Sequence, residues 1–441
     1  MRYSTYFLGC RVNQAEIEFF EDKLLKFGFE PSKDGKADII IFNTCAVTNK
    51  AEKESYRLIR KIFATNPSSK IFITGCIVPL NKSFINQVKE RIVQDNESLK
   101  KNVDNIYIIP STQKEKVIEI IEKEIIDKPH FDSSEISPKF IQRSKYYIKV
   151  QDGCNHFCTF CIIPYTRGRS RSKPVEQVVN EIKDICKNIE NNSDFGAEIT
   201  LTGICLGEYG LDINTSLAKL LKAIIPYIPE NARVRLSSMD LITLDEELIE
   251  VMASSPKICK FLHLSLQSGS NRILKLMKRN YTIEQYLDII DKLYRTIPDL
   301  GISTDIIVGF PTETEEDFNL TLEAAKKAKF HRIHIFPFSF RPYTLAYQKM
   351  RHIKIDHEKV KEFEKKLMIL SLEQSKNFIT ERQGKEYDIL VEEGGYGYTH
   401  NFIRIKTNVD KANCFVKVKI DGIEEEKGNF AVAKGLVTLP V

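Results

Sequence analysis

The sequence predicts an α/β protein with three parts: an amino-terminal parallel sheet, a central partial (β/α)6 barrel and a small carboxy-terminal all-β barrel. Three observations support this fold class. Strand-like apolar runs alternate with amphipathic helical stretches in the first part, which is typical of a parallel sheet. The alternation repeats six times in the middle of the chain, and near the end it changes to short strands. We therefore expect domains at residues 1–128, 140–372 and 375–441.

The amino-terminal part contains three predicted strands separated by two predicted helices. We expect the strands at residues 5–8, 38–42 and 70–73, and the helices near residues 14–26 and 51–64. Strands that alternate with helices in this way pair in parallel, because the helix returns the chain to the same end of the sheet.

Three cysteines follow these three strands: Cys10, Cys45 and Cys76. In an open parallel sheet, ligands bind just beyond the carboxyl ends of the strands, so these residues can converge at one edge. A single cysteine in such a place is more often a buried small residue. Three in the same position relative to their strands favour a shared metal site without a fourth protein ligand, and Gly9 and Gly75 would let the backbone approach it closely.

The central part contains six predicted strands, each followed by a helical stretch. Because the chemistry of such barrels takes place at the carboxyl ends of the strands, the loops after them are candidate site segments. His263, inside the fourth strand, is interpreted as a satisfied core residue. The strands are expected at residues 147–151, 198–202, 234–237, 261–266, 303–308 and 332–336, and nearby polar residues that could line a pocket are Thr202, Ser237, Ser238, Gln267, Ser268, Asp305, Ser339 and Arg341.

The loop after the first of these strands carries Cys154, Cys158 and Cys161 in a C-x3-C-x2-C spacing. Structural zinc sites close with four ligands, and bacterial ferredoxin runs use other spacings. Three thiolates without a fourth indicate an iron–sulfur cluster with an open iron, at which a substrate can bind. The alternative is a set of buried small residues or a zinc knuckle. His156 lies inside the loop, where reaching the same metal would be strained.

Length and composition exclude several classes of protein. The chain has 441 residues, of which 42% are hydrophobic, as in a globular protein with a real core. It has no run of about eighteen apolar residues and no apolar leader, so neither a membrane span nor a signal peptide is expected. We expect a cytoplasmic protein, whose ten cysteines indicate metal binding or catalysis rather than disulfides.

Positive charge gathers around the cysteine loop. The net charge of the whole chain is +5, but residues 136–173 alone carry eight basic residues against one acid, Asp152. Such a run is often only a solvated face. The functional alternative is a rim that binds nucleic-acid phosphates, for which Arg167, Arg169 and Arg171 are the substrate-binding candidates.

The end of the chain is predicted to form short strands after a charged helical stretch at residues 357–382. We expect these strands at residues 387–391, 402–405, 414–420 and 430–439. Small β-barrels of this kind often bind nucleic acid. Ten basic and ten acidic residues balance each other between residues 375 and 441, so charge does not decide the matter. The aromatic residues Tyr396, Tyr398 and Phe402 could stack on bases or form core.

With two cysteine trios, six barrel units and a terminal β-domain in this order, the whole chain resembles the radical S-adenosylmethionine (SAM) methylthiotransferases. Its tail resembles the TRAM domain of that family. The motifs that carry the resemblance are Leu-Gly-Cys-Arg-Val-Asn at residues 8–13, Asn-Thr-Cys at 43–45, Thr-Gly-Cys at 74–76, the cysteine loop at 153–165, His-Leu-Ser-Leu-Gln-Ser-Gly at 263–269, Thr-Asp-Ile-Ile-Val-Gly-Phe-Pro at 304–311 and Gly-Tyr-Thr-His-Asn at 397–401.

The resemblance implies two [4Fe-4S] clusters, with the six cysteines of the two trios as catalytic and cluster-binding residues. It implies that SAM binds the open iron of the second trio's cluster and is cleaved by one electron to a 5′-deoxyadenosyl radical. The other cluster is then expected to carry a methylated sulfur for insertion at C2 of an adenine. Further candidates for cofactor binding are Phe160, Gly203, Ser238, Gln267 and Asp305.

Members of this family act on isopentenyladenosine in tRNA, on threonylcarbamoyladenosine in tRNA or on an aspartate of a ribosomal protein. Residues 11–14 and 202–207 resemble the threonylcarbamoyladenosine branch. The expected partners are therefore a tRNA anticodon stem-loop and an electron donor of the flavodoxin or ferredoxin class, with the enzyme as a monomer. Tyr343 and the residues after Cys76 depart from the family pattern, which leaves local loop geometry open. The other branches remain alternatives, as does a non-catalytic iron–sulfur protein that binds RNA or senses redox state.

Overall fold

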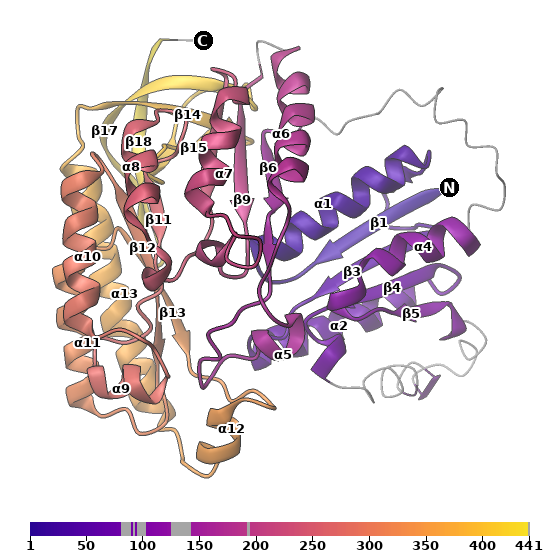
Figure 1. Cartoon of the computed structure of the whole chain (residues 1–441), viewed down its shortest axis with the longest axis horizontal. Coiled ribbons are helices and arrows are strands. Elements are labelled where there is room, and N and C mark those ends of the chain that lie inside the picture. Colours follow the sequence, from indigo (N-terminus) through magenta and orange to yellow (C-terminus); the bar gives the residue numbers. More distant parts are fainter. Residues whose placement is uncertain (81–89, 91–92, 95–102, 125–142, 192–194, 440–441) are drawn as a thin grey trace. The chain divides into compact units, whose positions relative to one another are not determined.

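Figure 1 shows the computed structural model of the chain, which describes residues 1–80, 90, 93–94, 103–124, 143–191 and 195–439. The chain folds into two compact units. The expected domain boundaries at residues 128 and 140 lie outside the described residues and stay predictions. Unit 1 comprises Met1–Gln142, Gly153–Arg169 and Ser339–Gln348, and unit 2 comprises Arg143–Asp152, Ser170–Phe338 and Lys349–Val441.

A five-stranded parallel sheet forms the centre of unit 1, in the order β2-β1-β3-β4-β5. The three strands and two helices expected from the sequence are confirmed as β1, β3, β4, α1 and α2. The strands β2 and β5 escape prediction because they have only two and three residues. The bounds are β1 Arg2–Phe7, α1 Arg11–Lys26, β2 Glu30–Pro31, β3 Ile39–Thr44, α2 Asn49–Thr65, β4 Lys70–Gly75, β5 Ile106–Ile108, α4 Glu115–Glu124 and α5 Ile163–Arg167, with short 3-10 turns at Val78–Leu80 and Ser111–Gln113.

Alternating strand residues of this sheet pack against helices on its two faces, because successive side chains of a strand point in opposite directions. On one face, Phe42 of β3 shares a core cluster with Ile62 of α2. On the other face, Ile41 of β3 clusters with Phe20 of α1. All four side chains are buried, so helices cover both faces of the sheet. A ligand can therefore bind only beyond the ends of the strands.

Unit 2 contains the six strands expected from the sequence. They are hydrogen-bonded as two parallel three-stranded sheets, in the orders β10-β9-β6 and β11-β12-β13. Isolated parallel bridges, Val234 to Ile258 and Met239 to Leu264, connect the regions of β10 and β11. The α/β architecture is confirmed, and the closure of these strands into one partial barrel stays a prediction.

The elements of unit 2 alternate strand and helix along most of its length. Its strands are β6 Lys145–Lys149, β7 Gln151–Asp152, β8 Arg171–Ser172, β9 Ala197–Thr202, β10 Ala232–Leu236, β11 Phe261–His263, β12 Gly301–Val308 and β13 Arg332–Pro337. Its helices are α6 Val175–Glu190, α7 Leu217–Ile224, α8 Glu246–Ser254, α9 Asn271–Leu276, α10 Ile283–Thr296, α11 Glu315–Ala328 and α13 His357–Thr380, and α12 spans Leu345–Met350. No helix in the described part of the chain is both long and apolar enough to cross a bilayer.

The last five strands close into a small barrel in the order β14-β15-β16-β18-β17. A buried apolar cluster that includes Ile389, Ile405 and Val418 fills it. The sequence did not predict β15, which has only three residues around a central glycine. The bounds are β14 Glu386–Glu392, β15 Tyr396–Tyr398, β16 Arg404–Lys406, β17 Phe415–Lys427 and β18 Phe430–Leu439.

Two half-buried aromatic residues in this part of the chain, Tyr398 and Phe402, stack on one another. The ring of Phe402 lies 4.6 Å from that of Tyr398 and 4.3 Å from that of Phe261 in β11, both in stacked geometry. Of the two interpretations offered by the sequence, the structure favours core packing for Phe402, because both faces of its ring contact protein.

Candidate functional site

The carboxyl ends of β3 and β4 meet at one edge of the sheet in unit 1, where Thr44 pairs with Gly75. Cys45 and Cys76 follow these two residues directly, and Cys10 is the N-cap residue of α1, which follows β1. The structure therefore places the three cysteines where the strand pattern predicted them.

Two glycines allow tight turns at this edge. Gly9 has φ +101° and Gly75 has φ +104°, a region that strains any residue with a side chain. A Cβ on Gly9 would lie 2.8 Å from Sγ of Cys45, so this thiol rests against the turn that leads into α1. A Cβ on Gly75 would lie 2.4 Å from the carbonyl oxygen of Thr44. Both glycines thus make tight turns next to the cysteines, and at Gly9 the backbone lies directly against a thiol.

The thiols of this trio influence one another electrostatically. Burial is the main reason that the pKa of Cys45 is raised to about 11, and the neighbouring Cys76 and Cys10 act in the same direction. Thiolates in such a place need a compensating positive centre, and a coordinated metal deprotonates its thiols outright. The chemistry of this donor set therefore fits a metal cluster.

Buried polar side chains hold the strand ends from both sides. Asn13 of α1 donates from Nδ2 to the carbonyl oxygens of Leu8 at 2.6 Å and of Thr44 at 3.0 Å. Ser55 of α2 donates to the carbonyl oxygen of Cys45 at 3.1 Å and accepts from its amide at 3.3 Å. Both side chains are buried, so these bonds compete little with water and fix the turns that carry the cysteines.

The second trio lies in the same compact unit. Cys154, Cys158 and Cys161 are half-buried in the loop that ends at α5. Gly153 begins this loop with φ +76°, and a Cβ there would lie 2.0 Å from the carbonyl oxygen of Arg169. Only glycine fits this crossing, which brings the two ends of the loop together. All six candidate ligands thus belong to unit 1.

Two N–H groups of the cysteine loop and its helix donate to cysteine sulfurs. The amide of His156 donates to Sγ of Cys154 at 3.5 Å. Nε of Arg167 donates to Sγ of Cys76 at 3.4 Å. Hydrogen bonds to ligand sulfurs are a main lever by which proteins set the potential of iron–sulfur clusters. Both trios therefore have features that suit cluster ligands.

A third segment of unit 1, Ser339–Gln348, holds the cysteine loop and α2. The amide of Ala346 donates to the carbonyl oxygen of Thr159 at 2.8 Å. The buried guanidinium of Arg341 binds Asn49 and Glu52 in the first turn of α2. Arg341 was expected to line a pocket, and in the structure it anchors this segment instead.

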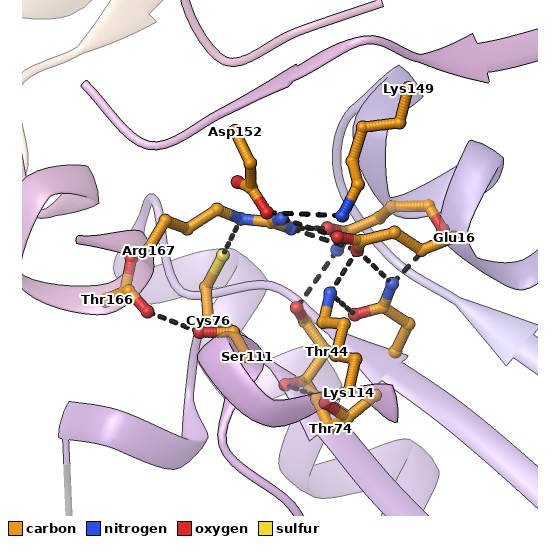
Figure 2. Close-up of polar contacts among 12 residues, drawn as sticks. Glu16, Thr44, Thr74, Cys76, Ser111, Lys114, Lys149, Asp152, Thr166 and Arg167 are labelled. Carbon is orange, nitrogen blue, oxygen red and sulfur yellow. Dashed lines mark hydrogen bonds and ion pairs between the residues drawn. The ribbon is translucent and has the colours of Figure 1, made fainter. Parts of the chain in front are cut away.

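Arg167 contradicts the prediction made for it. We expected it on a phosphate-binding rim, but its side chain is fully buried, with 0% exposure. Figure 2 shows its guanidinium between Cys76 on one side and Glu16 on the other, with Nη1 bonded to Oε1 of Glu16 at 2.8 Å. The prediction was wrong because the positive run around Arg167 is local in sequence, whereas its acidic partner lies 151 positions away.

The two other arginines of the run remain exposed. The guanidinium of Arg169 lies 4.4 Å from the centre of the Phe157 ring in unit 1. Arg171, in unit 2, is half exposed and lies 4.0 Å from the carboxylate of Asp152. Both side chains can still reach a ligand in solvent, so they stay candidates for phosphate contacts.

The expected cofactor-binding residues fall in both units. Phe160 is half-buried in unit 1, and the other four lie in unit 2, three of them after the carboxyl ends of strands and one within a strand. The amide of Gln267 donates to the carbonyl oxygen of Asp305 at 2.8 Å. The role of the set in SAM binding stays a prediction. Its members in unit 2 are Gly203 after β9, Ser238 after β10, Gln267 after β11 and Asp305 in β12.

A polar cluster surrounds Asp305. Nε2 of His263 lies 3.1 Å from its carboxylate, Ser265 donates to the same oxygen at 3.1 Å, and Nδ1 of His263 lies 2.8 Å from the hydroxyl of Ser303. Burial alone would raise the pKa of Asp305, but the adjacent His263 outweighs it, and the pKa lies below its usual range. Both ring nitrogens of His263 have partners, as expected for a satisfied core histidine.

Sequence reasoning missed the buried charges around Arg167. Glu16 of α1 and Lys114 form an ion pair with side-chain exposures of 4% and 6%. The one available signal was Glu16 itself, which lies among the buried positions Val12, Ile17 and Phe20 of α1. A carboxylate in an apolar helix stripe indicates a buried cation elsewhere in the chain, but does not say which one.

Two family models match the sequence: the radical SAM superfamily over residues 148–325 and the uncharacterized protein family UPF0004 over residues 2–95. A threonylcarbamoyladenosine tRNA methylthiotransferase MtaB from Thermotoga maritima is 36% identical over 95% of this chain and 94% of that protein. A protein of the same name from Aquifex aeolicus is 35% identical over 90% of this chain and 95% of its own length.

A tRNA-2-methylthio-N(6)-dimethylallyladenosine synthase from Thermotoga petrophila is 34% identical over 89% of this chain and 86% of that protein. Among solved structures, the radical S-adenosylmethionine methyltransferase TsrM from Kitasatospora setae matches with a TM-score of 0.54 at 13% identity. That match covers 78% of this chain and 77% of the other. At this identity the likeness concerns the fold alone.

Proposed function

The chain belongs to the radical SAM methylthiotransferase family, and from this membership we propose that it acts on tRNA as a threonylcarbamoyladenosine methylthiotransferase. The product is the 2-methylthio derivative of N6-threonylcarbamoyladenosine at the nucleoside just 3′ of the anticodon. This nucleoside lies in a single-stranded loop, so it enters an active site at low unpairing cost.

The observation that carries the proposal is the gathering of two cysteine trios in one compact unit. Each trio offers three thiols, which suits a [4Fe-4S] cluster with one iron left for another ligand. Arg167 comes from the segment of the second trio and donates to a sulfur of the first. A single catalytic process that needs both clusters is the simplest use of this arrangement.

The residues of the chain then have distinct tasks. Cys154, Cys158 and Cys161 would hold the cluster that binds SAM, and the first trio would hold the second cluster. When bound, these groups supply the electron for SAM cleavage and the sulfur for transfer. The turn at Gly9 brings backbone close to Sγ of Cys45, and the turn at Gly75 carries Cys76 past the backbone of Thr44.

The remaining parts of the proposal concern tRNA and unit 2. The exposed Arg169 and Arg171 would bind phosphates of the anticodon stem, which fixes position without reading sequence. The two three-stranded sheets would form the halves of a partial (β/α)6 barrel, and the small closed barrel would be a TRAM domain. A flavodoxin or ferredoxin would donate the electron, and the enzyme would act as a cytoplasmic monomer.

The test is anaerobic reconstitution with iron, sulfide, SAM, a reductant and tRNA that carries threonylcarbamoyladenosine, followed by mass spectrometry of the nucleosides. We expect about eight irons per chain and a 2-methylthio product. Cys76→Ala should halve the iron and abolish the product, whereas Cys186→Ala, in the apolar face of α6, should retain both. Full iron loading without any methylthio product would refute the proposal.

The second candidate is methylthiolation of isopentenyladenosine in tRNA, which the synthase from Thermotoga petrophila favours as a relative. The two candidates differ only in the group on N6 of the adenine. Parallel reactions with tRNA that carries one modification or the other separate them, and turnover of the isopentenyl substrate alone would replace the first proposal by the second.

A further inference from the structure

Arg167 is the residue of unit 1 whose position is least expected from the sequence. It ends α5, only six positions after Cys161, yet its side chain has 0% exposure. Its Nε–H points at Sγ of Cys76 at 3.4 Å, a normal distance for a hydrogen bond to sulfur. A residue from the segment of one trio thus touches a ligand of the other.

The guanidinium is fixed by partners on its far side. Nη1 donates to Oε1 of Glu16 at 2.8 Å, and Nη2 donates to Oε2 of Glu16 at 3.3 Å and to Oδ1 of Asn13. Glu16 is itself held by Lys114 and by Nδ2 of Asn43 at 2.8 Å. Because the fork of Arg is planar, anchoring its two ends aims the third nitrogen, Nε, at the sulfur.

The backbone of Arg167 is also held in place. The hydroxyl of Ser111 donates to the carbonyl oxygen of the preceding Thr166, as drawn in Figure 2. The amide of Gly168 donates to the carbonyl oxygen of Pro164 at 3.1 Å and closes the end of α5. Neither the main chain nor the side chain of Arg167 is therefore free to turn away from Cys76.

We propose that Arg167 is a positioning residue of the cluster at Cys10, Cys45 and Cys76, which it tunes through its Nε–H donated to the sulfur of Cys76. This role rests on the proposed function, because it requires a cluster at the first trio. A permanently charged donor at a ligand sulfur stabilises the more negative, reduced state of a cluster and so raises its reduction potential. It also holds the ligand sulfur in place, as donors around metal ligands do in general.

A merely structural role makes a different prediction. If Arg167 served only to neutralise Glu16, its replacement would lower the stability of unit 1 but leave the potential of an assembled cluster unchanged. The potential therefore separates the two roles, and melting temperature alone does not.

The first experiment measures the midpoint potential of the first-trio cluster in full-length protein in which Cys154, Cys158 and Cys161 are replaced by alanine. Arg167→Lys keeps the charge that pairs with Glu16 but removes Nε. We expect a shift of the midpoint to more negative potential in a titration followed by electron paramagnetic resonance. Arg57→Lys, on the exposed face of α2, is the matched control and should show the parent potential. An unshifted potential in Arg167→Lys with full iron loading would overturn the inference.

The second experiment needs no substitution at Arg167. The same full-length parent protein is labelled with ¹⁵N-arginine, its cluster is reduced, and hyperfine spectroscopy records weakly coupled nitrogen. We expect a ¹⁵N coupling in the parent and in Arg11→Lys, since Arg11 is the arginine next to Cys10 in sequence. A reduced cluster without any ¹⁵N coupling would refute the role of Arg167 while leaving the proposed function intact. A parent protein without a cluster at the first trio would refute both.

Discussion

Gly75 joins the end of β4 to Cys76 at a point where no side chain fits. Its φ of +104° is strained for other residues, and an added Cβ would lie 2.4 and 2.5 Å from backbone atoms of Thr44, which cannot move aside. We predict that Gly75→Ala lowers the free energy of unfolding by roughly 3 kcal/mol or more and prevents full loading of the first trio with iron. Thermal unfolding and iron analysis of the reconstituted protein measure the two effects.

Gly35 provides the control for this substitution. It lies in the same unit with φ +74°, but a Cβ there would meet only the hydroxyl of Tyr6 at 3.8 Å. Gly35→Ala should cost only the backbone strain of about 1 kcal/mol and leave iron loading intact. Equal effects of the two substitutions would show that the close approach at Thr44 does not matter.

Glu313 carries a pH dependence in unit 2. Burial raises its pKa to about 7, although its carboxylate accepts the amide of Gly309 at 2.6 Å. The folded state therefore binds this proton more tightly than the unfolded state, so stability falls as the pH rises from the ordinary pKa of 4.5 towards about 7, and the loss levels off above that pH. We predict that Glu313→Gln raises the melting temperature relative to wild type more at pH 8 than at pH 6. Glu323→Gln, at an exposed pair, should show no such difference.

At the level of single residues, the sequence predicted those site residues whose positions follow from their spacing along the chain. The six cysteines were recognisable because each trio has a regular relation to a strand or a loop. Arg167 was misplaced because burial of a charged side chain depends on partners such as Glu16 and Lys114, which only the fold brings near. One-dimensional charge counts do not contain that information.

Among the elements, β9 and β10 are joined to the small barrel by buried ions. Glu198 of β9 binds Arg233 at 2.8 Å and Arg235 at 2.7 Å, and its pKa is held far below its usual range by these arginines despite burial. Both arginines also bind the small barrel: Arg233 donates to the carbonyl oxygen of Tyr398 at 2.7 Å, and Arg235 donates to that of Thr399 at 3.0 Å. The carboxylate thus holds two cations that orient one element against another.

We predict that Glu198→Gln lowers the stability of unit 2 by about 3–5 kcal/mol, because it leaves two buried guanidinium groups without their anion. Urea unfolding followed by circular dichroism suits a chain with no tryptophan. The exposed pair of Glu247 and Lys222 is the matched control, and Glu247→Gln should leave the urea midpoint nearly unchanged, because water screens an exposed pair. A small effect at Glu198 would mean that the arginines find other acceptors.

The strands also show which secondary-structure elements can be predicted from the sequence. Long apolar strands such as β3 and β12 were expected within a few residues of their bounds, since both bury almost every side chain. The strands β2, β5 and β15 were not expected, because two or three residues carry too little periodicity and depend on pairing with a neighbour.

For the whole molecule, the sequence predicted the order of the sheet and barrel regions along the chain. It did not predict which segments form each of the two compact units. The sequence suggested consecutive domains, whereas unit 1 takes up Gly153–Arg169 and Ser339–Gln348 from within the later sequence. Composition and periodicity describe neighbours along the chain, so they cannot reveal that a distant loop completes the core of another part.

This assembly predicts that residues 1–142 do not form a fully stable fragment. Without Arg167, the buried Glu16 keeps Lys114 but loses its other cationic partner, at a cost of about 3 kcal/mol. Amides in α1 should then exchange with deuterium roughly 100-fold faster than in the full chain, as read by mass spectrometry. A fragment of residues 1–169 restores Arg167 and should recover much of the protection. Equal exchange in the two fragments would refute the prediction.

The discontinuous make-up of unit 1 also sets rules for recombining this enzyme with its relatives. A chimera that exchanges everything after residue 142 would keep Glu16 and Asn13 from this chain but take the residue at position 167 from the other parent. Their charge network would then combine residues of two different proteins. In such a chimera, the segments 153–169 and 339–348 should therefore come from the same parent as residues 1–142. Libraries built on that three-piece block keep both cysteine trios with the side chains that surround them.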